Sequence, residues 1–277
     1  MSDISSFNPN NLCQSANVST EQVWADIRKH AKEVAESEPQ LKCLLTDVVL
    51  NRECLGEALA ARLARKLSRE DMTRCELEPL LRDVFVNHPM VTKSAAADML
   101  AIVDRDPACQ SPMEPMLFFK GFLAMTTYRV AHHFWKNDRK PLALYFQSIC
   151  SEVFSVDIHP AARVGCGILL DHATSVVIGE TAIVEDNVSI LHEVTLGGTG
   201  KVGGNRHPIV RTGVLIGAGS KILGRVEIGQ CAKVGAGSVV LKDVPEHVTV
   251  AGVPAAIMGK ANTPAMDMNQ CFDGGSI

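Results

Sequence analysis

Four histidines lie in or beside residues 158–240, and histidine is the side chain whose ordinary pKa best suits proton transfer near neutral pH. They are His159, His172, His192 and His207. Two kinds of chemistry are open to such a set: metal binding by several imidazoles, or acid–base catalysis by one imidazole that a carboxylate orients. No two of these histidines have the His-x4-His spacing of a three-imidazole zinc site, and no carboxylate–cysteine cluster replaces it. The sequence therefore favours acid–base catalysis without a metal.

The segment that must position these side chains follows a period of six. Its aliphatic positions are Ile158, Val164 and Leu170, then, after a two-residue slip, Ile178, Val184, Ile190 and Leu196, and, after a thirteen-residue interruption, Val210, Ile216, Ile222, Ile228, Val234 and Val240. This period fits neither an α-helix nor a flat strand. It predicts a parallel β-helix, in which six residues make one short strand and a turn. Three such units close a coil, and stacked coils bury the aliphatic column.

Asp157 and His172 are the best candidates for an acid–base pair. They are fifteen residues apart, close to the eighteen of one full coil. Stacking would therefore place them about one strand spacing (roughly 4.8 Å) apart. An aspartate on one imidazole nitrogen would leave the other nitrogen as a base and would stabilise the imidazolium. The alternative is that His172 is an ordinary surface histidine.

The chain divides into three segments. Residues 1–154 are expected to form an all-α domain with 1–18 as a loose arm, residues 155–258 the β-helix, and residues 259–277 a flexible polar tail. Ser19 and Gln22 have the pattern of a capping box at the first helix. Further helices are expected at about 41–50, 55–67, 77–87, 94–104, 116–136 and 141–154. The interruption at 197–209 contains five glycines and is expected to be a mobile loop from one coil corner, where binding groups are common.

Composition limits the classes of partner. The net charge of −4 gives no general attraction for nucleic acid or for an anionic membrane. Nine cysteines without a Cys-x-x-Cys pair are typical of reduced thiols, and the N-terminus has no signal-peptide pattern. We therefore expect a cytoplasmic protein with no nucleic-acid or membrane partner.

Several motifs together resemble the serine O-acetyltransferase family. The most discriminating are Asp157-Ile158-His159-Pro160 and Leu170-Asp171-His172-Ala173, behind a helical domain that contains Arg105-Asp106-Pro107-Ala108. Val194–Gly200 and Arg206-His207-Pro208 also match, whereas Gly217-Ala218-Gly219 and Ala251-Gly252-Val253-Pro254-Ala255 are common to many β-helical acyltransferases. The resemblance covers nearly the whole chain, and it is weakest in residues 1–18 and in the tail.

The resemblance implies a left-handed coil and transfer of acetyl from acetyl-CoA to L-serine, the first step from serine to cysteine. His172 would be the general base and Asp157 its partner. Asp106 and Asp171 would hold the substrate ammonium, which requires negative charge. The substrate carboxylate would meet Arg206 and His207, and an arginine fork matches a carboxylate.

Acetyl-CoA would be a co-substrate and not a permanently bound cofactor. The resemblance implies that its pantetheine arm lies along the coil edge near Gly198 and Ala218. Lys233 and Lys242 would meet its phosphates. Small residues at the first two positions would let the arm approach the backbone.

The resemblance also implies partners and regulation. The chain would form a homo-oligomer, expected as a dimer of trimers. L-Cysteine would inhibit it at the serine site. The C-terminal Ile277 would dock into O-acetylserine sulfhydrylase, the cysteine synthase. Two alternatives stay open: an O-acyltransferase of the same fold acting on a sugar or another hydroxyl, and a scaffold without catalysis. The first would not need the paired charges assigned to the acceptor site.

Overall fold

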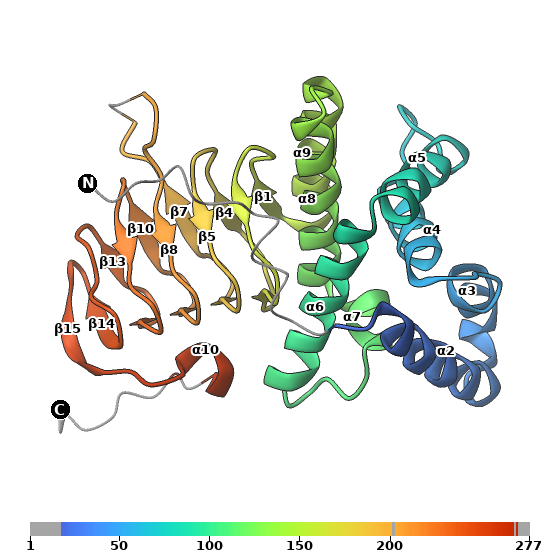
Figure 1. Cartoon of the computed structure of the whole chain (residues 1–277), viewed down its shortest axis with the longest axis horizontal. Helices are drawn as coiled ribbons and strands as arrows, with labels where there is room; N and C mark the ends of the chain where they lie inside the picture. The colour runs from blue at the N-terminus through green and yellow to red at the C-terminus, as the bar shows by residue number, and fades with distance from the viewer. Residues whose placement is uncertain (1–17, 201–202, 269, 271–277) are drawn as a thin grey trace.

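The computed structural model describes residues 18–200, 203–268 and 270. Its helices gather at one end of an elongated molecule, and its short strands stack into a prism at the other end (Figure 1). The helical part ends with α9 at Phe154, and the first strand begins at Val156. Both the parallel β-helix and its position behind a helical domain, which the sequence predicts, are confirmed.

The first helices have boundaries set by their caps. Helix α2 (Thr20–Ser37) begins at Ser19, whose hydroxyl accepts from the Gln22 amide nitrogen at 3.1 Å. The expected capping box is wrong in its second half, because the Gln22 side chain donates to Asp26 instead. A complete capping box is found at Thr73 and Glu76, at the start of α5 (Arg74–Asn87).

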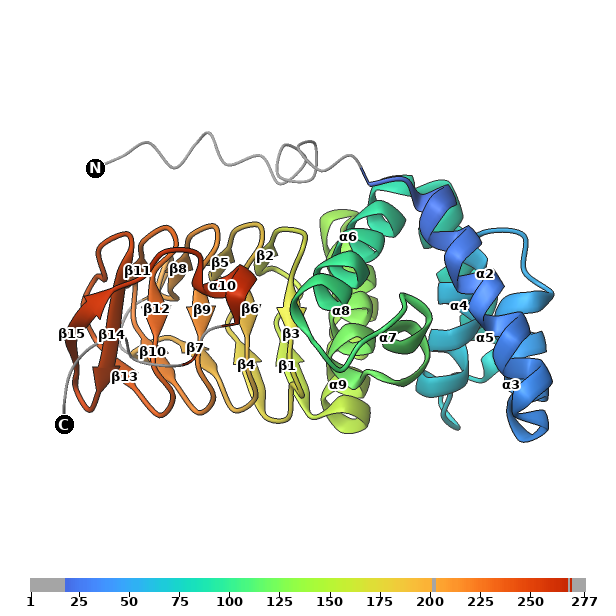
Figure 2. The same ribbon diagram turned by 90° about the horizontal axis from the view of Figure 1, so that it is seen from below.

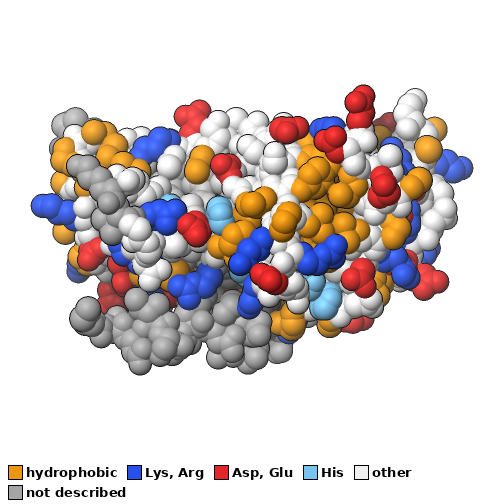
Figure 3. All heavy atoms as spheres, turned by 90° about the horizontal axis from the view of Figure 1, so that it is seen from above, with side chains coloured by type: hydrophobic (Ala, Val, Ile, Leu, Met, Phe, Trp, Pro, Cys, Tyr) orange, Lys and Arg blue, Asp and Glu red, His pale blue; other side chains and the backbone are white. Residues whose placement is uncertain are grey.

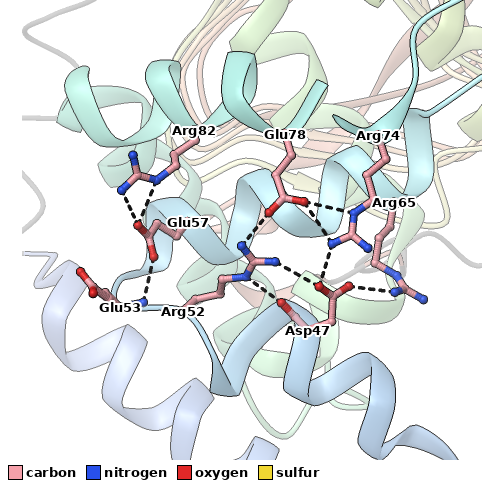
Figure 4. Close-up of polar contacts among 8 residues, drawn as sticks. All are labelled: Asp47, Arg52, Glu53, Glu57, Arg65, Arg74, Glu78 and Arg82. Carbon is pink, nitrogen blue, oxygen red and sulfur yellow. Dashed lines mark hydrogen bonds and ion pairs between the residues drawn. The ribbon is translucent and has the colours of Figure 1, made fainter. Parts of the chain in front are cut away.

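The region expected as one helix at 41–50 is irregular. It consists of a 3₁₀ turn, η2 (Pro39–Leu41), a short helix, α3 (Lys42–Leu45), and a π-helical turn, η3 (Thr46–Leu50). Helix α4 (Leu55–Leu67) has the expected bounds. A network of arginines and carboxylates ties η3 to α4 and α5 (Figure 4). Its centre is Asp47, which contacts three arginines.

Three further helices connect this region to the prism. Helix α6 (Pro89–Arg105) starts earlier than expected, because Pro89 serves as a first helical residue. The predicted helix 116–136 is two helices, α7 (Met113–Phe118) and α8 (Lys120–Lys136), because Phe119 has an extended backbone. Helix α9 spans Lys140–Phe154. Hydrophobic side chains gather on the surface near α8 and α9 (Figure 3).

The prism is made of fifteen short strands in the part of the chain that the structure describes. They are Val156–Ile158 (β1), Arg163–Val164 (β2), Leu169–Leu170 (β3), Val176–Ile178 (β4), Ile183–Val184 (β5), Ser189–Ile190 (β6), Thr195–Gly197 (β7), Ile209–Val210 (β8), Leu215–Ile216 (β9), Lys221–Leu223 (β10), Glu227–Ile228 (β11), Lys233–Val234 (β12), Val239–Val240 (β13), Val248–Gly252 (β14) and Ala255–Lys260 (β15). From β1 to β13 successive strands belong to three sheets in turn, and β14 and β15 extend the third sheet. The first sheet is β1-β4-β7-β10-β13, the second β2-β5-β8-β11, and the third β3-β6-β9-β12-β14-β15. All pairs except β14–β15 are parallel. Every aliphatic position of the six-residue period lies in one of β1 to β13 and is buried.

The helical part is hydrogen-bonded to the first coil. Arg129 of α8 is buried, binds the Asp98 carboxylate of α6 through two bonds of 2.8 and 2.9 Å, and donates to the Gly165 carbonyl. Asp98 in turn accepts from the Ile168 amide nitrogen at 2.9 Å. These contacts fix α6 and α8 against the coil that carries the candidate base.

The C-terminal segment differs from the expected flexible tail. Strand β15 runs to Lys260, and a short helix, α10 (Pro264–Asp267), follows, with Pro264 and Ala265 buried. Figure 2 shows α10 lying back along the prism beside β6. Ile277 and the arm 1–17 lie outside the described residues. No helix among the residues described is long and apolar enough to cross a bilayer.

Candidate active site

The site residues expected from the sequence gather at two edges of the first sheet. The acid corner is the turn region between the third and first sheets and carries Asp171, His172 and His192. The loop corner is the turn region between the first and second sheets and carries Arg206 and His207. Asp157 lies on β1, between the two corners.

The turn that carries His172 has an unusual backbone. His172, Ala173 and Ser175 all have φ near +55 to +60°, the left-handed region that costs a non-glycine residue about 1–3 kcal/mol. The turn is held by the Ser175 amide, which donates to the Ser155 carbonyl at 2.7 Å, and by Lys120 of α8, which donates to the Thr174 hydroxyl. The His172 side chain is 78% exposed, so its imidazole is open to a substrate.

Helix α8 supports the same corner through a close approach. A Cβ added at Gly121 would lie 1.9 Å from the Leu170 carbonyl oxygen, so only glycine lets the helix pack this close. Leu170 directly precedes Asp171. The acid corner is thus built on a strand end that the helical domain holds in place.

Three titratable groups, Asp171, His172 and His192, lie together at the acid corner, and the charge of Asp106 also acts on Asp171. Asp171 Oδ2 lies 3.9 Å from His172 Nε2, and the rings of His172 and His192 are 5.9 Å apart. Burial raises the pKa of Asp171, the charge of Asp106 raises it further, and His172 and His192 lower it. The Asp106 carboxylate, at the end of α6, also accepts from the Ala108 amide nitrogen at 2.9 Å.

The expected Asp157–His172 hydrogen bond is not formed in the single chain, in which both residues are described. One Asp157 oxygen accepts from Gln147 Nε2 of α9 at 2.6 Å. The β-ladder places Asp157 opposite Val177, because the two-residue slip puts His172 into the corner. Hydrogen bonds between catalytic residues are often long without substrate, so this geometry leaves the pair as a candidate.

Thr181 orients the two candidate residues of the loop corner. Its hydroxyl and amide nitrogen bond His207 Nδ1 at 2.9 and 3.1 Å, and its hydroxyl accepts from the Arg206 amide at 3.0 Å. Because Nδ1 accepts from an amide, the neutral ring carries its proton on Nε2. Burial lowers the pKa of His207, and the nearby charge of Arg206 lowers it further. His207 is therefore a neutral hydrogen-bond donor.

Two neighbours fix the remaining groups of the loop corner. Arg206 Nη2 pairs with Glu180 at 2.7 Å, and this bond lowers the pKa of Glu180. The His207 ring packs so closely on Gly179 that a Cβ there would lie 2.0 Å from Nε2. The corner presents an arginine and an imidazole N–H together, which suits a carboxylate.

The candidate coenzyme residues lie at both corners. Gly198 follows β7 at the loop corner, and Ala218 follows β9 at the acid corner. Lys242 is exposed beyond β13, but Lys233 is only 5% exposed within β12. Of the two lysines expected at phosphates, Lys242 is thus the one open to a ligand.

Sequence reasoning assigned no role to His192. Its Nδ1 is buried without a hydrogen-bond partner among the described residues, and its ring stands against His172. Its position in the repeat is the signal that could have identified it. His192 follows β6 just as His172 follows β3, and β6 stacks on β3 in the next coil. No group of three His, Cys, Asp or Glu side chains in the described ranges could hold a metal ion.

The chain is similar to proteins of one family. A family model described as "Serine acetyltransferase, N-terminal" matches residues 23–127. The serine acetyltransferase of Haemophilus influenzae is 50% identical over 254 residues, which are 91% of this chain and 95% of that protein.

Solved structures agree with the sequence relatives. The serine acetyltransferase of Vibrio cholerae matches with a TM-score of 0.90 and 49% identity, over 92% of this chain and all of the other. A serine acetyltransferase complex with cysteine also has a TM-score of 0.90 and 49% identity, over 92% of this chain and all of the other. The Brucella abortus enzyme in complex with coenzyme A has a TM-score of 0.85 and 50% identity, over 87% and 97% of the two chains. Identity near one half over nearly the full length of both chains is far beyond a shared fold: this chain belongs to the serine acetyltransferase family and is an acyltransferase.

Proposed function

We propose that the protein transfers the acetyl group of acetyl-CoA to the hydroxyl of L-serine, giving O-acetyl-L-serine and CoA, the first step from serine to cysteine. Relatives with this name, one solved with coenzyme A and one with cysteine, support the choice of substrates. Cysteine differs from serine only in sulfur for oxygen, so a site that holds one by its ammonium and carboxylate can hold the other. The observation that carries the proposal is the exposed His172 beside Asp171 in a chain of this family.

The proposed base is His172. Its exposed imidazole takes the proton of the serine hydroxyl while the oxygen attacks the thioester carbonyl, and collapse of the adduct breaks the C–S bond and releases CoA. Asp157 is the proposed partner that orients the ring and stabilises the imidazolium. The Gln147 bond occupies Oδ1 of Asp157, so Oδ2 is the oxygen proposed to accept from His172.

The charges proposed to bind the zwitterion are divided between the two corners. Asp106 and Asp171 belong to the acid corner, and Arg206 and His207 to the loop corner. Within one chain these corners stand at opposite edges of the first sheet; from Ser175 to Gly179 a strand advances about 13 Å. That is longer than serine, so we propose that the loop corner of one copy faces the acid corner of another.

A homo-oligomer, proposed as a dimer of trimers, would supply such interfaces. Val177 of β4 and Leu241, which directly follows β13, are 38% and 54% exposed, and hydrophobic side chains also gather near α8 and α9 (Figure 3). Exposed apolar groups of this kind favour burial against another copy. Acetyl-CoA is proposed to lie in the same interface, between Gly198 and Lys242 of one copy and Ala218 of the next.

Two further proposals follow from the family. L-Cysteine is proposed to inhibit by occupying the serine site, and the C-terminal Ile277, outside the described residues, to dock into O-acetylserine sulfhydrylase. A free carboxylate beside one apolar side chain is what an amino-acid site would recognise.

The test is release of free CoA thiol with L-serine and, separately, with a panel of sugar and other alcohol acceptors. We expect serine alone to support turnover, and His172→Ala to lower kcat by about 10²–10⁴-fold with the thermal midpoint unchanged. His247→Ala serves as the matched control, because it removes an exposed imidazole of the prism that lies at neither corner. Near-native turnover in His172→Ala, or preference for a sugar, would refute the proposal.

A further inference from the structure

Arg105, the last residue of α6, is a buried arginine next to the proposed substrate-binding Asp106. It is only 4% exposed. Its guanidinium reaches the second coil of the prism, where Nη1 donates to the Ser189 hydroxyl at 3.2 Å and Nη2 to the Asn187 side-chain oxygen at 3.1 Å. Ser189 in turn donates to the Ala265 carbonyl of α10 at 2.9 Å. One side chain thus joins the end of α6 to the prism.

This arrangement is poorly explained by stability. Both partners of Arg105 are neutral, its Nε has no hydrogen-bond partner, and it makes no ion pair with a carboxylate among the residues described. Burial lowers the pKa of Arg105 and outweighs the charges of Asp104 and Asp98, which act in the opposite direction. A buried charge without a direct ion pair costs free energy, and an apolar residue of similar size is often at least as stable in such a place. A role in positioning gives the residue a reason that stability does not.

The group that it would position is Asp106. The Asp106 amide donates to the Ile102 carbonyl at 2.8 Å, so this residue moves with the end of α6. The strand that Arg105 binds also holds Asp171, because the Asp171 amide donates at 2.8 Å to the carbonyl of Ile190, the residue after Ser189. Asp106 and Asp171 carry like charges, and their repulsion is a force that other contacts must oppose. The bonds of Arg105 to Asn187 and Ser189 oppose it.

We propose that Arg105 is a positioning residue that holds Asp106 beside Asp171 and thereby gives the enzyme its selectivity for an acceptor with an ammonium group. The proposal rests on the proposed function. It assigns to Arg105 no contact with substrate and no part in proton transfer.

The test compares two acceptors in Arg105→Met. L-Serine and 3-hydroxypropionate share the hydroxyl and the carboxylate, but only serine has the ammonium. We expect the ratio of their kcat/KM values to fall by about 10-fold in the variant, the size of losing one charged contact. The KM for acetyl-CoA should change less than 2-fold, because the coenzyme does not meet the ammonium end.

Matched variants separate positioning from general damage. Arg62→Met removes another buried arginine with a neutral partner, since Arg62 of α4 donates to the Leu117 carbonyl of α7, and it should lower the thermal midpoint without changing the acceptor ratio. Asn187→Ala and Ser189→Ala each remove one hydrogen-bond acceptor of Arg105 on the prism. Each should lower the acceptor ratio, so the two variants test the positioning role even if Arg105→Met does not fold. In the Arg105→Met background, Asp106→Asn should cause little further loss.

The outcomes are distinct. An unchanged acceptor ratio in folded Arg105→Met, or in both anchor variants, would overturn the inference and leave the proposed function standing. Absence of serine-dependent turnover in the unaltered protein would overturn the proposed function itself.

Discussion

Replacing Asp47 with asparagine should lower the free energy of unfolding of the helical part by about 1–2 kcal/mol at neutral pH. The Asp47 carboxylate contacts Arg74, Arg65 and Arg52 at 2.7, 2.8 and 3.1 Å (Figure 4). The hydrogen bond from Arg74, aided by that from Arg65, lowers the pKa of Asp47 from 3.8 to about 2. Such a shift corresponds to about 2.5 kcal/mol of stability. The Asp47 carboxylate is 26% exposed, and solvent screening reduces this contribution to the expected loss of about 1–2 kcal/mol.

The pH dependence has a definite sign. Because the folded state lowers the pKa of Asp47, its contribution is complete above the unfolded value near 4 and is lost as the pH falls towards 2. The difference between the two proteins should be nearly full at pH 6 and about half as large at pH 3. It should also shrink in 1 M NaCl, since salt screens charges at the surface.

Denaturant unfolding followed by tryptophan fluorescence measures this effect, because both tryptophans, Trp24 and Trp135, lie in the helical part. Glu33→Gln is the matched control: Glu33 is exposed on α2 and makes no ion pair within the described ranges. It should change the free energy of unfolding by less than about 0.5 kcal/mol. If Asp47→Asn cost no more than this control, or cost the same at pH 6 and pH 3, the reasoning would be refuted.

Three other changes test the site and its partners. Gly179→Ala should raise the KM for serine about 10-fold, because the added Cβ displaces His207. Gly203→Ala is the control, because its added Cβ meets no atom within 4 Å and should leave the KM unchanged. Equal KM values for the two variants in steady-state assays would contradict the role of His207. L-Cysteine should inhibit competitively with serine and bind more weakly to Arg206→Ala in calorimetry; inhibition independent of serine concentration would exclude a shared site. Deleting Ile277 should weaken binding to O-acetylserine sulfhydrylase in titrations and leave acetyl transfer unchanged, and equal affinity with and without it would end that proposal.

The β-helix could be predicted from the sequence in detail because its period is set by burial alone. Each aliphatic side chain points into a narrow core, so a shift in register would expose it to water. The spacing of these residues is therefore regular enough to be recognised in the sequence. The helical part has no such constraint. The break at Phe119 carries no proline or glycine signal, and it was missed because the conformation of that residue depends on the packing of α7 and α8.

The site could be predicted only in part, because spacing along a coil does not specify corners. The fifteen-residue separation of Asp157 and His172 predicts that the two stack on each other, but the ladder sets Asp157 opposite Val177 and leaves His172 in the turn that follows β3. Arg105 could not be found from the sequence, since its partners Asn187 and Ser189 are more than eighty residues away and belong to another domain. Long-range polar contacts of this kind leave no local pattern.

The two departures from the six-residue period coincide with the acid corner and the loop corner. A prism of identical coils would present identical corners, and none of them could distinguish one substrate group from another. The two-residue slip adds length to the turn at 171–175 and allows the left-handed residues that expose His172. The interruption at 197–209 returns to the prism through Arg206 and His207. Hydrogen bonds from both sides hold the turn at 171–175. The Ser175 amide donates to the carbonyl of Ser155 at the end of α9, and the Glu193 amide of the next coil donates to the Thr174 carbonyl. The regular repeat and the helical domain therefore support the irregular turns in which we propose the chemistry takes place.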